Sequence, residues 1–209
     1  MDKLFPSFAS LVSRIGSVQI RNVGTIGGNI ATASPIGDTL PCLIALDATL
    51  ILCSGNGDRR LSIDKFFLDY RKTDLKKGEF IKAIYIPNLG TNQKFRTYKI
   101  SKRYDQDISS IIGAYRIEFD GETLSEVRIA YGGMSATPKR GKKCEAALVG
   151  KPWNMETLRL ASSQVPEVFT PISDFRGSRD YRLEVASNLF DRLYEDIESP
   201  ENIIEVMNL

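Results

Sequence analysis

Hydrophobic side chains recur at helical spacing at the start of the chain. The apolar positions of this pattern are Leu4, Phe8, Leu11, Val12 and Ile15. They predict a first helix that ends near Gly16. Shorter apolar patterns follow, and they predict a helix over 40–46 and strands over 48–54 and 59–63, joined by a tight turn at 55–58.

The next pattern completes the first half of the chain. Asp64 is placed to cap a helical turn over 65–70, and a strand-like pattern predicts a strand over 79–87. A polar stretch follows this strand, and the character of the sequence changes beyond it. We therefore expect two units, 1–87 and 88–209.

The second half is rich first in strand patterns and then in helix patterns. An antiparallel sheet is expected from three strands, 94–101, 110–119 and 123–132. Helices are expected over 140–149, over 154–165 with Asn154 as its cap, and over 178–197 with Ser178 as its cap. Strands followed by a helical layer favour an α+β architecture over a doubly wound sheet.

The last of these helices carries an apolar stripe. Its members recur every four residues and are Tyr181, Val185, Leu189, Leu193 and Ile197. Such a stripe predicts packing on the sheet. Contact with another subunit is the alternative.

Composition narrows the functional classes. The chain has 209 residues, of which 42% are hydrophobic and 26% charged, as in ordinary soluble domains. A net charge of +2 and the lack of a basic stripe with interleaved aromatics argue against nucleic acid as a partner. The longest apolar run, 48–53, is far below the roughly 20 residues that span a bilayer. No secretory signal pattern is present, so we expect no membrane association and a cytoplasmic location.

The chain contains no histidine. This excludes Ser-His-Asp catalysis, histidine-based zinc sites and imidazole acid–base chemistry within it. The three cysteines, Cys42, Cys53 and Cys144, form no Cys-x-x-Cys pair, and an iron–sulfur cluster usually needs four thiolates. We expect reduced, mostly buried thiols and no metal site. No residue is predicted to be catalytic, so chemistry must come from a cofactor or a partner.

Residues 17–38 are the most informative segment. Gly27 and Gly28 lack a Cβ, so they can adopt positive φ and let a ligand approach backbone N–H groups. Hydroxyl, amide and carboxyl groups flank them, at Thr25, Asn29, Thr32, Ser34 and Asp38. Such groups suit ribityl hydroxyls and a pyrophosphate better than a metal. The alternative is an ordinary glycine-rich turn.

Four motifs together resemble one family. They are the Arg-Asn-Val-Gly-Thr-Ile-Gly-Gly-Asn segment with its continuation to Asp38, Tyr-Arg-Lys-Thr at 70–73, residues 98–109, and Tyr-Gly-Gly-Met at 131–134. In order and spacing they resemble the flavin domain of xanthine dehydrogenase, a molybdenum hydroxylase, as found in the small subunit of the bacterial form. The resemblance covers almost the whole chain and implies FAD as cofactor.

The resemblance also implies a fold and a set of FAD contacts. It predicts the remainder of a PCMH-type FAD-binding subdomain, followed by the three-stranded sheet and its helices. Pyrophosphate contacts would come from the backbone of Gly24, Thr25, Gly28 and Asn29, and contacts near the ribityl chain from Thr32 and Asp38. The nucleotide would be walled by Ile15, Gly16 and Ile20.

Nearer the isoalloxazine ring, the resemblance places Phe80 and Ile81 as apolar packing and Lys99 as a cation beside the ring. A cation there would favour the negatively charged reduced ring. The alternatives are a plain core strand for Phe80 and Ile81, and a solvated lysine for Lys99. The charged loop 102–107 would lie beside the flavin and influence access of NAD, or would be merely solvated.

Family members place an iron–sulfur region and a first flavin-binding segment before the point where this chain begins. We therefore expect a C-terminal part of the flavin subunit, inactive in isolation. Iron–sulfur clusters and molybdopterin would reside on that upstream segment or on a molybdopterin-binding partner subunit. Electrons from purine oxidation would reach FAD and then NAD. The alternatives are the flavoprotein subunit of a carbon monoxide or aromatic-substrate dehydrogenase, and a non-catalytic assembly module without flavin.

Overall fold

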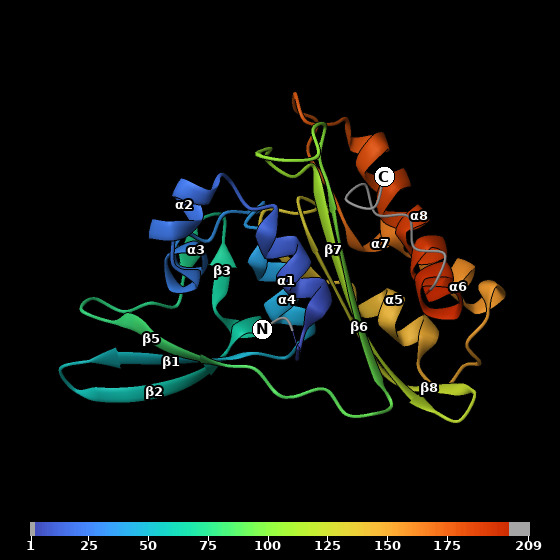
Figure 1. Cartoon of the computed structure of the whole chain (residues 1–209), viewed down its shortest axis with the longest axis horizontal. Helices are drawn as coiled ribbons and strands as arrows, with labels where there is room; N and C mark the ends of the chain where they lie inside the picture. The colour runs from blue at the N-terminus through green and yellow to red at the C-terminus, as the bar shows by residue number, and fades with distance from the viewer. Residues whose placement is uncertain (1–2, 201–209) are drawn as a thin grey trace.

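The computed structural model describes residues 3–200, which form two main sheets with a group of helices between them (Figure 1). The first helices are α1 (Pro6–Ser13), α2 (Val18–Val23), α3 (Ile26–Thr32) and α4 (Thr39–Ala45). The small sheet contains β1 (Thr49–Ser54), β2 (Gly57–Ser62) and β5 (Phe80–Tyr85), in the order β2-β1-β5. Between β2 and β5 in the sequence lie a 3₁₀ helix, η1 (Ile63–Lys65), and a short ribbon of β3 (Phe67–Asp69) and β4 (Lys72–Thr73).

The larger sheet is antiparallel and has the order β6-β7-β8-β9. Its strands are β6 (Gln93–Ile100), β7 (Ile111–Asp120), β8 (Thr123–Gly132) and the short β9 (Lys139–Arg140). The helices that follow are α5 (Lys142–Leu148), α6 (Met155–Ser162), α7 (Val165–Val168) and α8 (Arg179–Glu198). The predicted α+β architecture is confirmed, and the three expected strands gain a two-residue fourth.

Helices cover both faces of the larger sheet (Figure 1). Helices α1 and α4 pack on one face, where Phe95, Ile112 and Ala130 join the core of the first elements. Helices α5 and α8 pack on the other face, and α6 lies against both of them. The same sheet therefore separates two hydrophobic cores, which explains why β7 is buried along most of its length.

The predicted caps of the later helices are confirmed. Asn154 accepts a hydrogen bond from the backbone N–H of Thr157, and Ser178 accepts one from Tyr181. The stripe on α8 is correct only in part. Leu189 and Leu193 are buried, whereas Tyr181 is exposed. The buried face also contains residues outside the four-residue repeat, namely Arg182, Ala186, Phe190 and Asp196. The helix turns by 100° per residue, so a strict four-residue repeat drifts off one face.

The predicted helical turn over 65–70 is wrong. Residues 67–69 form β3, and Asp64 lies within η1, where it makes no helix cap. The Asp64 carboxylate instead pairs with Arg128 at 3.0 Å and with Arg140 at 3.1 Å. Two guanidinium groups from the larger sheet outweigh the ~1 kcal/mol that a local cap typically contributes.

The glycine-rich segment also differs from its prediction as a loop. Ser17 caps α2 and Thr25 caps α3, and Gly27 and Gly28 lie inside α3 without positive φ. Positive φ occurs instead at Ala33, which ends α3. Glycine has a low helix propensity, but the Thr25 cap and the burial of Ile30 compensate for it.

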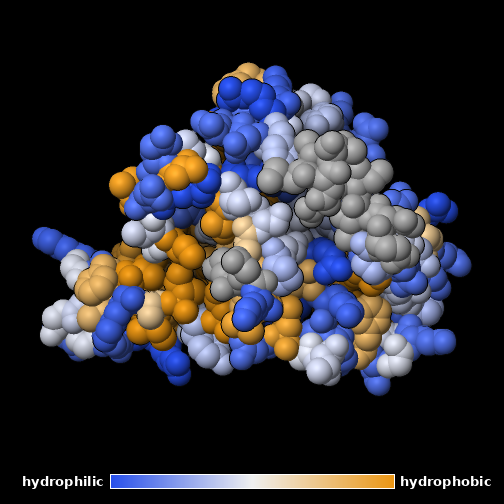
Figure 2. Space-filling view, in the orientation of Figure 1, coloured by the Kyte–Doolittle hydropathy of each residue, from blue (hydrophilic) through white to orange (hydrophobic). Residues whose placement is uncertain are grey.

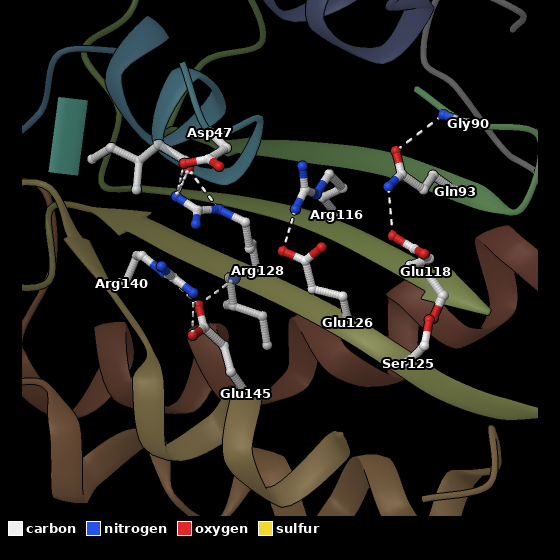
Figure 3. Close-up of polar contacts among 12 residues, drawn as sticks. Asp47, Gly90, Gln93, Arg116, Glu118, Ser125, Glu126, Arg128, Arg140 and Glu145 are labelled. Atoms are coloured by element: carbon white, nitrogen blue, oxygen red, sulfur yellow. Dashed lines mark hydrogen bonds and ion pairs between the residues drawn. The ribbon is translucent and has the colours of Figure 1, made fainter. Parts of the chain in front are cut away.

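Polar contacts tie the first elements to the larger sheet (Figure 3). Arg128 of β8 is buried, and its guanidinium donates to the Ile44 carbonyl and pairs with Asp47 at 3.0 Å. Arg140 forms two hydrogen bonds with Glu145, at 2.9 and 2.7 Å. Paired, hydrogen-bonded charges are the form in which arginine is tolerated inside a protein.

The thiols match their predicted environment in two of three cases. Cys42 and Cys144 are buried, whereas Cys53 is half-buried on β1. Burial raises the pKa of both buried thiols to about 12, because the thiolate would lose its hydration. Within residues 3–200, no helix is long and apolar enough to cross a membrane.

The Glu79 carboxylate provides a test of the small sheet. It accepts hydrogen bonds from Arg59 at 2.7 and 2.8 Å and from the Lys76 N–H at 2.8 Å, which lower the pKa of Glu79 to about 2. A lowered folded pKa stabilises the fold above the unfolded pKa of about 4.3, and this contribution is lost as pH falls towards 2. Thus Glu79→Gln should lower Tm at pH 7, and the difference from the parent should close between about pH 4.3 and 2.

Thermal unfolding followed by circular dichroism across this pH range measures the effect. The control is Glu122→Gln, at an exposed turn between β7 and β8, which should leave Tm unchanged at every pH. A Tm difference for Glu79→Gln that persists unchanged at pH 2 would assign the effect to something other than this carboxylate.

Candidate functional site

The Asp38 and Lys99 side chains form a buried ion pair. Asp38 ends the polar segment before α4, and Lys99 lies near the end of β6. The Lys99 Nζ lies 2.5 Å from Asp38 Oδ2, and the Lys99 side chain is only 1% exposed. The solvated alternative for Lys99 is therefore wrong. The pair joins two of the motifs that resemble the flavin domain, 21–38 and 98–109.

Two further groups complete the environment of Lys99. Its Nζ donates to Ser109 Oγ at 2.8 Å and to the Asp107 carbonyl at 3.0 Å. Ser109 Oγ donates in turn to Asp38 Oδ1 at 2.9 Å. The Asp107 carboxylate accepts from the Arg103 N–H, which lowers the pKa of Asp107 and folds the loop. Ser109 was not among the predicted site residues, and only its place within the 98–109 motif could have indicated it.

Helix α3 positions the remaining polar residues of the segment. The Thr25 hydroxyl accepts from the Gly28 N–H at 2.9 Å, and the Thr32 hydroxyl donates back to the Gly28 carbonyl at 2.8 Å. Asn29 Oδ1 accepts from the Thr39 hydroxyl at 2.6 Å, directly beside Asp38 in the chain. The backbone N–H of Asn29 is also taken, because it donates to the Thr25 carbonyl at 3.0 Å. These residues therefore form a folded surface and not an open nest of N–H groups.

The predicted nucleotide wall lies at the junction of α1 and α2. Gly16 adopts φ of +55°, and an added Cβ would lie 3.0 Å from Ile20. Arg21 donates to the carbonyls of Ile15 and Gly16, at 3.2 and 2.8 Å. Gly24, which follows α2, bonds its N–H to the Ile20 carbonyl at 2.8 Å. The structure thus groups Ile15, Gly16, Ile20 and Gly24 around one short helix.

Apolar side chains are exposed near these residues. Figure 2 shows hydrophobic surface over the small sheet and the neighbouring α3 and β3. Phe80 of β5 is 57% exposed, and Ile20 is 58% exposed. Ile81 is half-buried and packs beside Gly27, where an added Cβ would meet it at 3.7 Å. Phe80 is thus not the plain core residue of the alternative interpretation, and an exposed aromatic ring suits contact with a ligand.

The Tyr-Gly-Gly-Met motif supports the same region from β8. The Gly133 N–H donates to the Pro35 carbonyl at 2.8 Å. An added Cβ at Gly132 would lie 3.3 Å from the same carbonyl and 3.1 Å from Pro41. Both glycines therefore allow the segment before Asp38 to approach the sheet closely. These contacts link the motif to residues almost one hundred positions earlier.

The loop after β6, residues 101–108, is also held by the residue that ends α1, Arg14. The Arg14 guanidinium donates to the Tyr104 carbonyl at 3.0 and 3.1 Å and to the Lys99 carbonyl at 3.2 Å, and it stacks on the Tyr104 ring at 4.5 Å. Beside this contact an open pocket of about 510 Å³ lies between α1, β6 and α8, lined in part by Arg14, Lys99 and Asp196. No cluster of three or more potential metal ligands occurs among residues 3–200.

Two family models match the chain. The FAD binding domain in molybdopterin dehydrogenase matches residues 1–89, and the CO dehydrogenase flavoprotein C-terminal domain matches residues 96–197. The chain belongs to the FAD-binding family of the molybdenum hydroxylases. The predicted resemblance is therefore confirmed, and the chain corresponds to the FAD-binding part of such an enzyme, with FAD as the cofactor of this part.

Relatives of this family differ in what their names say they oxidise. The glyceraldehyde dehydrogenase medium chain of Sulfolobus acidocaldarius is 34% identical over 88% of this chain and 64% of its own length. The xanthine dehydrogenase/oxidase of Gallus gallus is also 34% identical, over 90% of this chain and 15% of its own length. The chain thus spans less than two thirds of both relatives.

The fold of the family is the same in a solved structure. The carbon monoxide dehydrogenase from Hydrogenophaga pseudoflava superposes with a TM-score of 0.86 and 30% identity, over 91% of this chain and 66% of that chain. The predicted PCMH-type flavoprotein fold is therefore confirmed.

Proposed function

We propose that the chain supplies one wall of the FAD site in a xanthine dehydrogenase-like molybdenum hydroxylase. Electrons from the oxidation of hypoxanthine or xanthine would pass through iron–sulfur clusters to FAD and then to NAD. The observation that carries this proposal is the buried Asp38–Lys99 pair, since it brings two motifs that resemble the xanthine dehydrogenase flavin domain into direct contact. The chain itself would supply binding and orientation, and no acid–base catalyst.

The described residues fit a flavin. FAD needs close backbone approach at its pyrophosphate, polar partners for the ribityl hydroxyls and apolar surface for its rings. Gly24 and Gly28 are exposed and lack side chains, and the exposed Thr32 hydroxyl retains an acceptor lone pair. Exposed Ile20 and Phe80 offer apolar surface. Residues Thr25, Asn29 and Asp38 would orient the polar part of the cofactor.

The partners follow from the same proposal. A molybdopterin-binding subunit and an upstream iron–sulfur and flavin segment would deliver electrons, and bound FAD would supply hydride transfer to NAD. The loop at 102–107 would then border the path of NAD, because Lys99 holds the Asp107 carbonyl at its base and Arg14 holds Tyr104 near its middle. The loop belongs to the same hydrogen-bonded unit as Asp38.

A second candidate is oxidation of an aldehyde or of carbon monoxide. It is favoured by the glyceraldehyde dehydrogenase medium chain, which is as similar to this chain as the avian xanthine enzyme is. Anaerobic addition of hypoxanthine, glyceraldehyde or carbon monoxide to the assembled complex, with flavin absorbance as the readout, distinguishes them. Bleaching by hypoxanthine and recovery with NAD support the xanthine type. Bleaching by glyceraldehyde or carbon monoxide, without bleaching by hypoxanthine, would refute the xanthine type.

The role of α3 is tested by Gly28→Val. An added Cβ at Gly28 would lie 3.0 Å from the Thr25 hydroxyl that caps the helix, so the branched side chain would disturb the cap and cover the exposed backbone. We expect FAD content in the assembled complex to fall at least tenfold, with substrate oxidation at the molybdenum centre retained. Flavin absorbance per subunit measures it.

The control carries the same substitution at an open position. Gly55 lies at the tip of the β1–β2 hairpin with no atom within 4 Å of an added Cβ, so Gly55→Val should keep full FAD content. Parental FAD content in Gly28→Val would remove α3 from the site. A parent complex that itself lacks FAD would favour a non-catalytic assembly module.

A further inference from the structure

Ser109 closes a ring of hydrogen bonds around the Asp38–Lys99 pair. Its hydroxyl accepts from Lys99 Nζ at 2.8 Å and donates to Asp38 Oδ1 at 2.9 Å, while Lys99 contacts the other carboxylate oxygen at 2.5 Å. All three residues are buried, with 1%, 8% and 6% exposure for Ser109, Asp38 and Lys99. One hydroxyl thus serves both members of the ion pair.

The ammonium of Lys99 has no donor to spare. It carries three N–H groups, and these are taken by Asp38, Ser109 and the Asp107 carbonyl. Direct donation to a flavin would therefore require that one of these bonds break. The Asp38 carboxylate is different, because two oxygens offer about four lone-pair positions and the ring uses two of them. Asp38 can still accept from a ligand, and Lys99 instead acts through its neighbours.

We propose that Ser109 is a positioning residue of the FAD site, which fixes the Asp38 carboxylate and the base of loop 101–108 through Lys99. The proposal rests on the proposed function of the chain as part of that site. Without the hydroxyl, Asp38 loses a donor and Lys99 loses an acceptor, so both charges are held less firmly. The Lys99 side chain is 1% exposed and that of Asp38 10%, so the cofactor would meet the carboxylate and not the freed ammonium N–H. The less neutralised carboxylate then disfavours the negatively charged reduced flavin.

The test compares three variants in the assembled flavoprotein complex. Ser109→Ala removes the hydroxyl, and Ser109→Thr retains it. Ser110→Ala is the matched control, because Ser110 is equally buried and adjacent but donates to the Arg176 carbonyl and not to the ion pair. FAD affinity of the apoprotein is measured by fluorescence titration, and the flavin midpoint potential by redox titration.

We expect Ser109→Ala to weaken the binding of oxidised FAD about tenfold and the binding of reduced FAD about a hundredfold. The additional factor of ten for the reduced form lowers the two-electron midpoint potential by about 30 mV. Ser109→Thr should restore both values towards those of the parent, and Ser110→Ala should change neither. Loss of packing alone would affect both alanine variants alike. Parental affinity and potential in Ser109→Ala would overturn the proposal.

A second readout does not need the cofactor. Loop 101–108 contains exposed Lys102 and Arg103. Its base is tied to the Asp38–Lys99–Ser109 hydrogen bonds by the Lys99 contact with the Asp107 carbonyl. Trypsin should therefore cleave after Lys102 or Arg103 at least threefold faster in Ser109→Ala than in the parent or Ser110→Ala, as followed by mass spectrometry. Equal cleavage rates would overturn the link to the loop. If the parent complex holds no FAD, the proposed function fails, while this cleavage assay still tests Ser109.

Discussion

Replacing Gly133 with alanine should destabilise the fold by about 3–5 kcal/mol, because strain and collision act together. Gly133 adopts φ of +80°, and an added Cβ would lie 2.3 Å from the Ser110 carbonyl oxygen and 2.9 Å from Arg182 Nη1. Neither neighbouring group can move away without loss of stability. The Ser110 carbonyl is backbone, and Arg182 is fully buried with hydrogen bonds to Ser110 and Gly133. The free energy of unfolding in urea measures the loss.

The matched control separates strain from collision. Gly150 adopts a similar φ of +75°, but no atom lies within 4 Å of an added Cβ. Gly150→Ala should therefore cost only the left-handed strain, about 1–2 kcal/mol. If Gly133→Ala and Gly150→Ala lose the same stability, the collision must be relieved by movement of the Ser110 segment, and the close approach at the Tyr-Gly-Gly-Met motif would not be essential.

Lys99→Met should lower the free energy of unfolding by about 3–5 kcal/mol, because it leaves the Asp38 carboxylate buried without its partner. The Asp38 side chain is 10% exposed and that of Lys99 is 1% exposed, so little solvent reaches the pair to replace the lost ammonium. The same change at Lys94, which is exposed on the same strand, should be nearly neutral. Urea unfolding of the three proteins measures the difference.

The double variant Asp38→Asn with Lys99→Met identifies the cause. With both charges removed, the loss of stability should be smaller than for Lys99→Met alone, since no buried charge remains unpaired. In the flavin-loaded complex, Lys99→Met should also lower the midpoint potential, whereas the double variant should shift it little. An equal loss of stability in the single and double variants would show that packing of the lysine stem, and not its charge, is what the fold needs.

The sequence alone predicted the elements whose signals are local. The strand pattern over 110–119 predicted β7, and Asn154 and Ser178 at the starts of apolar patterns predicted α6 and α8 with their caps. These features depend on residues within a few positions of one another, so a linear pattern contains them. The family was recognisable for a related reason, since four spaced motifs are a property of the sequence itself.

Tertiary structure decided what depends on distant partners. Lysine at an inward position of β6 had no visible partner in the sequence, because Asp38 lies 61 residues earlier and Ser109 follows the loop. Burial of Lys99 is possible only once the fold supplies that carboxylate. Asp64 lost its predicted capping role because Arg128 and Arg140, on the larger sheet, are stronger partners for its carboxylate.

The glycine-rich segment shows both what a local pattern can predict and what only the folded protein decides. Its composition indicated a ligand site, and its Gly-Gly pair suggested an open loop with positive φ. The fold instead makes it helical, because Thr25 caps α3 and Ile30 is buried against α4 and its neighbours. Packing of one apolar side chain outweighs the low propensity of two glycines, and that packing exists only in the folded protein.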